Sequence, residues 1–264
     1  MNAIRVPVLM YHRVGDARNP WEARYAIGTA QFAAHMRALA QKGYRAVGID
    51  TFADWLEGKG DLPDGAFVLT FDDGFLGVGL HAWPILRELA WPFTIFLVSG
   101  MLGGQDEWTR TSNPSGTTHP LLAERDIVEM QAYGVSFHSH TRTHPSLTAI
   151  SRAQLADELA GSRQRLEQVL GREVAYLAYP YGHVDERVEA AARDAGYRAA
   201  FSTRPGFNRR DVERFRIRRL DIFGTDTPAM LMRKIRFGTN DGTLAHATRY
   251  YLERMRARAC ALLP

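Results

Sequence analysis

Short apolar runs alternate with longer stretches of helical periodicity along most of the chain. The apolar runs predict strands at residues 5–11, 45–49, 66–71, 93–98, 135–139, 175–178, 199–202 and 215–222. Apolar positions three and four residues apart predict helices at 29–42, 77–90, 123–133, 152–170, 185–195 and 227–237. Because helices separate strands that are apolar almost throughout, we expect an α/β fold with a parallel sheet.

The ends of several predicted helices carry the residues that helix termini favour. Ser151 with Gln154 three residues later forms a capping-box pattern, and glycines follow three helices at Gly134, Gly171 and Gly196. No repeat or linker interrupts the 264 residues, a length that suits one α/β barrel. We therefore expect a catalytic domain over residues 1–240 and a basic C-terminal helix over 241–264 that belongs to it.

Polar residues stand directly after four of the apolar runs. They are His12, the pair Asp72–Asp73, His140, and the dipeptide Pro180–Tyr181. The carboxyl ends of parallel strands meet at one edge of a sheet or barrel, so these residues are expected to converge on one cavity. The segment 103–120 is long, polar and without periodicity, which is typical of a functional loop.

Asp72 and Asp73 form the first candidate for chemistry. Neighbouring residues in a strand point to opposite sides, so both carboxylates reach one site only where the strand gives way to a loop, which Gly74 allows. One acid can then bind a cation while the other acts as a base. The alternative is an ordinary solvated turn.

His140 and His144 have the i, i+4 spacing that would place both imidazoles on one helical turn, ended by Pro145. With Asp73 they make a His₂-carboxylate set that leaves coordination positions open, as a catalytic metal requires. The single cysteine, Cys260, excludes a disulfide framework and a cysteine-based zinc site. We therefore expect one divalent metal ion, zinc in the first place, although this ligand set suits several first-row ions.

Residues 178–182, Ala-Tyr-Pro-Tyr-Gly, form the third candidate. A proline followed by an aromatic residue and a glycine can direct a backbone N–H toward a cavity, and a tyrosine ring can form a wall of a substrate pocket. Tyr179, Pro180 and Tyr181 are therefore candidate substrate-binding residues. The alternative is a plain turn.

These three segments together resemble the polysaccharide deacetylase family, also called the NodB-homology domain or carbohydrate esterase family four. Residues 70–74 are similar to its Thr-Phe-Asp-Asp-Gly motif, 139–145 to its Ser-His-Thr-x-x-His-Pro motif and 179–182 to its third motif. Residues 10–14 and 135–147 resemble the branch that modifies exopolysaccharides. The resemblance implies a distorted, TIM-like (β/α) barrel, expected with seven strands, and removal of N- or O-acetyl groups from sugar polymers. It implies a metal held by Asp73, His140 and His144, with Asp72 as general base and the Tyr181 N–H at the oxyanion.

The chain departs from the family pattern at two places. Tyr179 stands where many members have an arginine that orients the base, so we assign that role to Arg219. The fifth motif, Leu-x-His, is present at residues 244–246 but lies beyond the barrel pattern, so we interpret it as coincidence and take His12 as the general acid. His138 is expected to be a packing residue.

The remaining histidines and tryptophans receive ordinary interpretations, with one exception. Trp108, in the long loop, is a candidate for stacking on a sugar ring. Core or interface positions are expected for the other four tryptophans, Trp21, Trp55, Trp83 and Trp91. No role at the site is expected for His35, His81, His119, His183 and His246.

The net charge of +4 is unevenly distributed. Residues 201–264 carry fourteen basic and six acidic residues, whereas 1–200 carry nineteen basic and twenty-three acidic ones. Thirty of the basic residues are arginine, which we attribute to genome composition rather than to nucleic-acid binding. In the basic segment 244–258, a solvated helix face is favoured over peripheral contact with a membrane or an acidic polymer.

The apolar runs are too short for a transmembrane segment, and the first residues lack the pattern of a secretory signal. A cytoplasmic location is therefore expected, unless a leader has been removed. Oligomeric state is not indicated.

The function expected is metal-dependent deacetylation of an N-acetylated sugar in a polysaccharide or its oligosaccharide precursor. Two alternatives remain open: an amidase that acts on a small substrate, and a carbohydrate-binding protein with a relict metal site.

Overall fold

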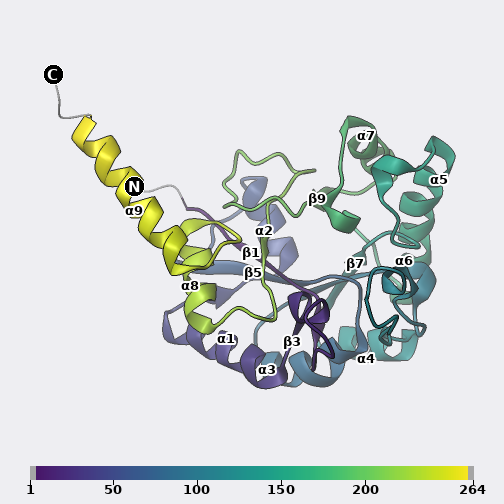
Figure 1. The fold of residues 1–264 in the computed structure, drawn as a ribbon. Coiled ribbons are helices and arrows are strands. Elements are labelled where there is room, and N and C mark those ends of the chain that lie inside the picture. The colour runs from purple at the N-terminus through teal and green to yellow at the C-terminus, as the bar shows by residue number, and fades with distance from the viewer. Residues whose placement is uncertain (1–3, 261–264) are drawn as a thin grey trace.

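The computed structural model describes residues 4–260, and its centre is a curled sheet of seven parallel strands (Figure 1). Their order is β10-β1-β5-β6-β7-β8-β9. The bounds are β1 (Val8–Tyr11), β5 (Ala66–Phe71), β6 (Thr94–Leu97), β7 (Ser136–Ser139), β8 (Tyr176–Ala178), β9 (Ala199–Phe201) and β10 (Leu220–Asp221). Three short strands complete the set: β4 (Arg45–Ala46) pairs with β5, and β2 (Arg13–Val14) pairs with β3 (Ala26–Ile27).

The barrel closes only weakly. β10 pairs with β1. Ile217, three residues before the start of β10, forms a single parallel bridge to Phe201 of β9. The segment expected as one strand over 215–222 therefore contacts both sheet edges, but only Leu220–Asp221 is regular strand. This arrangement confirms the distorted seven-stranded (β/α) barrel that the sequence predicts.

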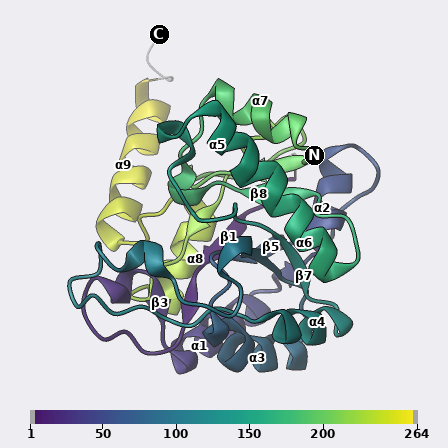
Figure 2. The same ribbon diagram turned by 90° about the vertical axis from the view of Figure 1, so that its right-hand side faces the viewer.

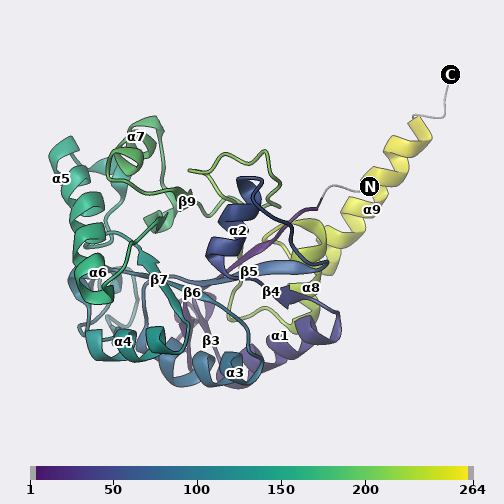
Figure 3. The same ribbon diagram turned by 180° about the vertical axis from the view of Figure 1, so that it is seen from behind.

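Helices surround the strands (Figures 2 and 3). The α-helices are α1 (Thr29–Gln41), α2 (Ile49–Leu56), α3 (Trp83–Glu88), α4 (Glu124–Ala132), α5 (Arg152–Ala156), α6 (Ser162–Leu170), α7 (Glu186–Asp194), α8 (Pro228–Phe237) and α9 (Leu244–Cys260). Two π-helical segments are η2 (Val78–Ala82) and η6 (Asp157–Gly161). The 3₁₀ turns are η1 (Glu22–Arg24), η3 (Ser99–Met101), η4 (Glu107–Thr109), η5 (Leu147–Ala149) and η7 (Pro180–Gly182).

Alternating strand residues divide the interior into two apolar clusters. In β5, Phe67 and Leu69 belong to a cluster shared with the outer helices, whereas Val68 belongs to a second cluster. That second cluster contains Phe96 of β6 and Phe52 of α2. Because successive strand side chains point to opposite faces, both faces of the sheet are buried, which explains the near-continuous apolar runs.

Several predicted element bounds were wrong. The strand expected over 45–49 ends at Ala46. Ile49, which the sequence placed in that strand, is instead the first residue of α2. The helices expected over 77–90 and 152–170 each contain a π-helical segment. Short apolar runs do not distinguish a strand from a buried helix, so such errors arise at element ends.

The predicted helix ends are confirmed at two positions. The Ser151 hydroxyl accepts a hydrogen bond from the Gln154 N–H, and Gly171 ends α6 with a φ of 64°. The C-terminal helix α9 projects from the body of the molecule (Figure 1). Residues 261–264 of the predicted terminal helix lie outside the described residues. None of the helices within residues 4–260 is both apolar enough and long enough to span a membrane.

Candidate metal centre and active site

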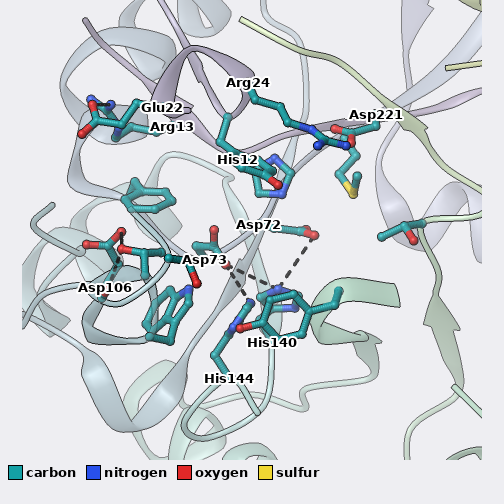
Figure 4. A pocket seen from close by; sticks show the side chains of 18 of the residues that line it. His12, Arg13, Glu22, Arg24, Asp72, Asp73, Asp106, His140, His144 and Asp221 are labelled. Atoms are coloured by element: carbon teal, nitrogen blue, oxygen red, sulfur yellow. Dashed lines mark hydrogen bonds and ion pairs between the residues drawn. The ribbon is translucent and has the colours of Figure 1, made fainter. Parts of the chain in front are cut away.

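A cavity of about 490 Å³ lies at the carboxyl ends of the barrel strands. Residues that follow β1, β5, β7, β8, β9 and β10 line it, as expected for a parallel barrel. Figure 4 shows the side chains of Asp72, Asp73, His140 and His144 pointing toward one another. Residues far apart in the sequence therefore meet at one site.

Asp72 and Asp73 reach this cavity together because the chain bends directly after β5. Asp73 has a φ of 72° and Gly74 a φ of 79°, both in the left-handed region. A side-chain-bearing residue there is strained, and such strain is found at functional sites. Both carboxylates are almost fully buried, so the interpretation as a solvated turn does not hold.

His140 and His144 also face the cavity, but the predicted helical turn between them was wrong. Thr141 and His144 have φ values of 68° and 64°, so the chain forms an irregular loop. The loop is fixed by Glu158, whose carboxylate accepts hydrogen bonds from the backbone N–H groups of Arg142 and Thr143. The i, i+4 spacing indicated the right pair of residues for the wrong geometric reason.

The ligand atoms of Asp73, His140 and His144 all lie within 4.8 Å of one another. The Asp73 Oδ1 atom is 3.5 Å from Nε2 of His140 and 3.3 Å from Nε2 of His144. Three convergent nitrogen and oxygen ligands are the number that catalytic zinc sites use, since the remaining positions stay open.

Two further observations show that these residues fit a divalent ion. The buried Asp73 Oδ1 atom has no hydrogen-bond partner in the described part of the chain. The Nδ1 atom of His140 is 2.8 Å from the Ala178 carbonyl oxygen, which requires a proton on Nδ1 and leaves a lone pair on Nε2. Burial lowers the pKa of His140 to about 4, so this imidazole is neutral at pH 7.

Arg219 is joined to Asp72 by two hydrogen bonds. Its Nη1 and Nη2 atoms lie 2.6 and 2.8 Å from the two carboxylate oxygens, and its Nε donates to the Ser202 carbonyl. Burial would raise the pKa of Asp72, but the charge and hydrogen bonds of Arg219 together with the nearby His140 and His12 outweigh it, and the pKa is lowered. The guanidinium that contacts Asp72 thus belongs to Arg219, directly before β10, the residue to which the sequence analysis assigned this role.

His12 lies at the end of β1 and lines the same cavity. Its ring packs edge-on against Tyr25, and its buried Nδ1 has no hydrogen-bond partner within residues 4–260. Asp221 also lines the cavity, and burial raises the pKa of this carboxyl (Figure 4). A histidine beside the metal ligands, with a free ring nitrogen, is suited to proton transfer.

The three candidate residues of the third motif differ in burial and in their contribution to the cavity lining. Tyr181 is 52% exposed at the cavity, with a left-handed φ of 59°. Tyr179 also contributes to the lining, but its side chain is fully buried and electrostatically coupled to Glu189. Pro180 is buried and is not among the lining residues. Of the three, Tyr181 alone offers an exposed side chain to a substrate.

Aromatic residues of two loops form much of the remaining wall. Trp108, from the long polar loop, stacks on His144 with ring centroids 4.7 Å apart. Trp21 also lines the cavity, so its expected core or interface position was wrong. Its neighbours in the sequence are polar and charged, and this context was the available indication that the tryptophan is not a core residue.

His119 and Glu22 were missed by sequence reasoning. The Nε2 atom of His119 lies 3.2 Å from a carboxylate oxygen of Glu22, and the Glu22 carboxylate accepts hydrogen bonds from Arg13 and Asn113. This cluster joins the loop before β3 to the long loop, and both residues line the cavity. It braces the two segments that carry Trp21 and Trp108.

Two histidines that the sequence analysis placed outside the site, His138 and His246, do not line the cavity. His138 packs against Phe96 and Tyr176 on the other side of β7. His246, of the apparent fifth motif, lies on α9 near Asp241 and does not line the cavity. This position favours its interpretation as a coincidental match, which stays a prediction.

Comparisons with known proteins agree with this geometry. The family model for polysaccharide deacetylase matches residues 59–200, which is more than half of the chain. A Bacillus subtilis protein named as a polysaccharide deacetylase, YxkH, is 25% identical over 83% of this chain and 71% of its own length. The poly-β-1,6-N-acetyl-D-glucosamine N-deacetylase of Staphylococcus aureus is 22% identical over 67% of this chain and 61% of that enzyme.

Solved structures show the same fold. IcaB from Ammonifex degensii superposes with a TM-score of 0.73 at 28% identity, covering 89% of this chain and 97% of that one. The Streptococcus pyogenes deacetylase PplD, in complex with acetate, gives a TM-score of 0.75 at 20% identity, covering 90% and 99%. Together with the motifs at Asp72–Asp73 and His140–His144, the match establishes that this chain belongs to the polysaccharide deacetylase family.

Proposed function

We propose that this protein is a metal-dependent deacetylase that hydrolyses the acetyl amide of an N-acetylated sugar in a polysaccharide or its oligosaccharide precursor. One observation carries the proposal: the ligand set Asp73, His140 and His144 shares a cavity with a carboxylate, Asp72, that Arg219 holds in place. A metal site next to an oriented base is the arrangement that hydrolysis of an unactivated amide needs.

Asp73, His140 and His144 would hold the ion, and we propose zinc because three nitrogen and oxygen ligands with open positions suit it. A divalent ion supplies Lewis acidity, which polarises the acetyl carbonyl and lowers the pKa of water. The Ala178 carbonyl keeps the His140 ring in the orientation that this role requires.

The surrounding residues account for the proton transfers. Asp72 accepts a proton from the attacking water, because Arg219 keeps this carboxylate ionised and oriented. The water oxygen bonds to the acetyl carbon, and the backbone N–H of Tyr181 donates to the oxyanion. His12 then gives a proton to the sugar nitrogen as the C–N bond breaks, so that acetate and an amine leave.

A sugar polymer suits the walls of the cavity. Trp21, Trp108 and Tyr181 present aromatic surface beside the metal ligands, and such surface stacks on the apolar faces of sugar rings. The names of the related enzymes support an N-acetylated sugar. The alternative of a binding protein rested on the missing arginine and on the uncertain fifth motif, and the contact from Arg219 to Asp72 weakens the first of these grounds.

Acetate release tests the proposal. Zinc-loaded protein is incubated with N-acetylglucosamine oligomers of increasing length, the monosaccharide, an O-acetylated polymer and a small acetamide. We expect metal-dependent acetate release from the N-acetylated oligomers, rising with length. Release from the small amide alone would favour an amidase, and oligomer binding without any release would favour a carbohydrate-binding protein.

A further inference from the structure

A second cavity, of about 650 Å³, lies between the segment after β9 and the end of α8. Four arginines line it: Arg204, Arg209, Arg216 and Arg218. Its apolar lining comes from Pro205, Val212 and the half-buried Phe207 and Phe237. The proposed reaction uses none of these side chains.

The positive charge of this second cavity is largely unpaired. Arg216 is engaged by Glu189 and lies 3.7 Å from Glu213. The guanidinium groups of Arg204, Arg209 and Arg218 have no carboxylate within 4.0 Å in the part of the chain that the structure describes. Asp211 is the lining acid that likewise has no ion-pair partner there. Three free cations thus face one free carboxylate.

The cavity has a fixed shape because two glycines allow close packing. A Cβ atom at Gly206 would lie 2.7 Å from the Cδ atom of Arg218, so the arginine side chain crosses this residue closely. A Cβ atom at Gly238 would lie 2.7 Å from Cε2 of Phe207. The Arg5 guanidinium lies 4.2 Å from the centre of the Phe207 ring and holds it from another side.

The two cavities share a wall. Thr203 lines the catalytic cavity and the next residue, Arg204, lines the second one. In the same way Asn240 lines the catalytic cavity and Gly238 the second. The two linings therefore meet at neighbouring residues of the same segments, whose consecutive Cα atoms are about 3.8 Å apart.

From this geometry we propose that the second cavity, defined by Arg204, Arg209 and Arg218, binds a carboxylate-bearing sugar of the same polymer. The inference rests on the proposed function and narrows its substrate to an acidic, N-acetylated polysaccharide. Arginine forks bind carboxylates through paired hydrogen bonds, and this cavity offers three guanidinium groups to such a ligand. A neutral polymer would leave the three guanidinium groups without partners.

Binding is tested first, independently of catalysis. Calorimetry compares oligogalacturonate, an acidic sugar oligomer without acetyl groups, with a neutral galactose oligomer of the same length. The double variant Arg204→Gln, Arg209→Gln removes two exposed cations. The control is Arg37→Gln on α1, an exposed arginine that forms no ion pair with the residues that the structure describes. We expect salt-sensitive binding of the acidic oligomer, weakened about tenfold or more in the double variant and unchanged in the control.

Three binding results would overturn the subsite: equal affinity of the double variant and the wild type, equal affinity for the neutral oligomer, or tighter binding of single-stranded DNA at the same arginines. The last would indicate a general polyanion surface.

Catalysis gives the second test. The substrates are hyaluronan oligosaccharides, which alternate glucuronate with N-acetylglucosamine, and neutral N-acetylglucosamine oligomers of equal length. We expect the double variant to raise the KM for the acidic substrate relative to the KM for the neutral one, with kcat for the acidic substrate retained. An unchanged KM ratio would contradict the subsite. A lack of acetate release from both substrates would refute the proposed function, and the binding experiment would still decide the subsite.

Discussion

Arg219 and Asp72 lie 147 positions apart in the sequence and form a two-point ion pair in the wall of the catalytic cavity, with N···O distances of 2.6 and 2.8 Å. Both side chains are almost completely buried. Paired hydrogen bonds to a planar guanidinium fix the orientation of the carboxylate as well as its charge. The assignment of Asp72 as the base depends on this contact.

Arg219→Gln is expected to lower kcat by about 100-fold, at the lower end of what general base catalysis contributes. Asp72 has a lowered pKa in the native protein, so it is ionised and competent above that pKa. Removal of the guanidinium raises this pKa, and the acidic limb of the pH–rate profile therefore moves to higher pH. The profile of kcat/KM against pH measures the shift.

Arg219→Lys is the companion variant, because it keeps the charge and loses the second hydrogen bond. The acidic limb of its pH–rate profile should therefore shift less than that of Arg219→Gln. If the rate falls in both variants while the limb stays in place, Arg219 has only a structural role, and Asp72 is not the base.

Replacing a metal ligand should remove the ion. Asp73→Asn and His140→Gln each take one of three ligands from a buried site, so we expect metal content to fall well below one ion per chain. Elemental analysis after gel filtration measures it. His81→Gln, at an exposed histidine on η2, is the control and should keep full occupancy. Full occupancy in both ligand variants would refute the ligand assignment.

His12 and His246 compete for the role of general acid. We expect His12→Gln to lower kcat by about 100-fold, because the imidazole proposed to give a proton to the sugar nitrogen is then missing from the cavity. His246→Gln should leave the rate near that of the wild type, since this residue lies on α9 outside the cavity. The opposite pattern would restore the fifth motif as the source of the acid.

Replacement of Trp21 tests whether the aromatic wall of the catalytic cavity binds substrate. Trp21→Ala should raise the KM for N-acetylated oligomers several-fold, the range expected for a lost stacking contact, with metal content unchanged. Trp108 is less suitable because it stacks on the ligand His144. Trp83→Ala is the matched control, since Trp83 is half-buried beside Tyr133 and lies outside the cavity. Equal effects of both replacements would mean that Trp21 does not contact the sugar.

Glu22 should make stability depend on pH. Burial would raise its pKa, but hydrogen bonds from the Arg18 N–H, Asn113 and His119 lower it to about 2. A carboxyl with a lowered native pKa stabilises the fold above its unfolded pKa of about 4.5, and this contribution disappears as the pH falls toward 2. This pKa shift corresponds to a contribution of Glu22 to the free energy of unfolding on the order of 3 kcal/mol.

Urea unfolding from pH 6 to pH 2 measures this contribution. The difference in unfolding free energy between wild type and Glu22→Gln should shrink as the pH falls through that window. Glu107→Gln, at a carboxylate whose ion pair with Arg110 is exposed, should change the pH dependence little. A difference between wild type and Glu22→Gln that is constant with pH would show that Glu22 is not held ionised.

Much of the site was predictable because strand ends are visible in the sequence. The buried run 66–71 is followed by Asp72 and Asp73, and the expected strand has the bounds of β5. Parallel strands then bring Asp73 to His140 and His144 without any local contact between them. The pairing of Arg219 with Asp72 was suggested by a departure from a motif, and the contact is present.

What the sequence did not predict depends on loop geometry and on contacts between loops. The left-handed residues Thr141 and His144 replace the helical turn that the i, i+4 spacing predicted. Trp21 and His119 reach the cavity through the network around Glu22, which joins segments about ninety residues apart. Periodicity does not encode such contacts, because each depends on where two irregular segments meet.

Metal titration with acetate release tests the central claim most directly. Protein stripped with a chelator is reloaded in steps with zinc, and acetate from an N-acetylglucosamine oligomer is measured at each step. The proposed site predicts that the rate rises linearly with occupancy and reaches its plateau at one ion per chain. Undiminished acetate release from the stripped protein, or none from the fully loaded protein, would contradict it.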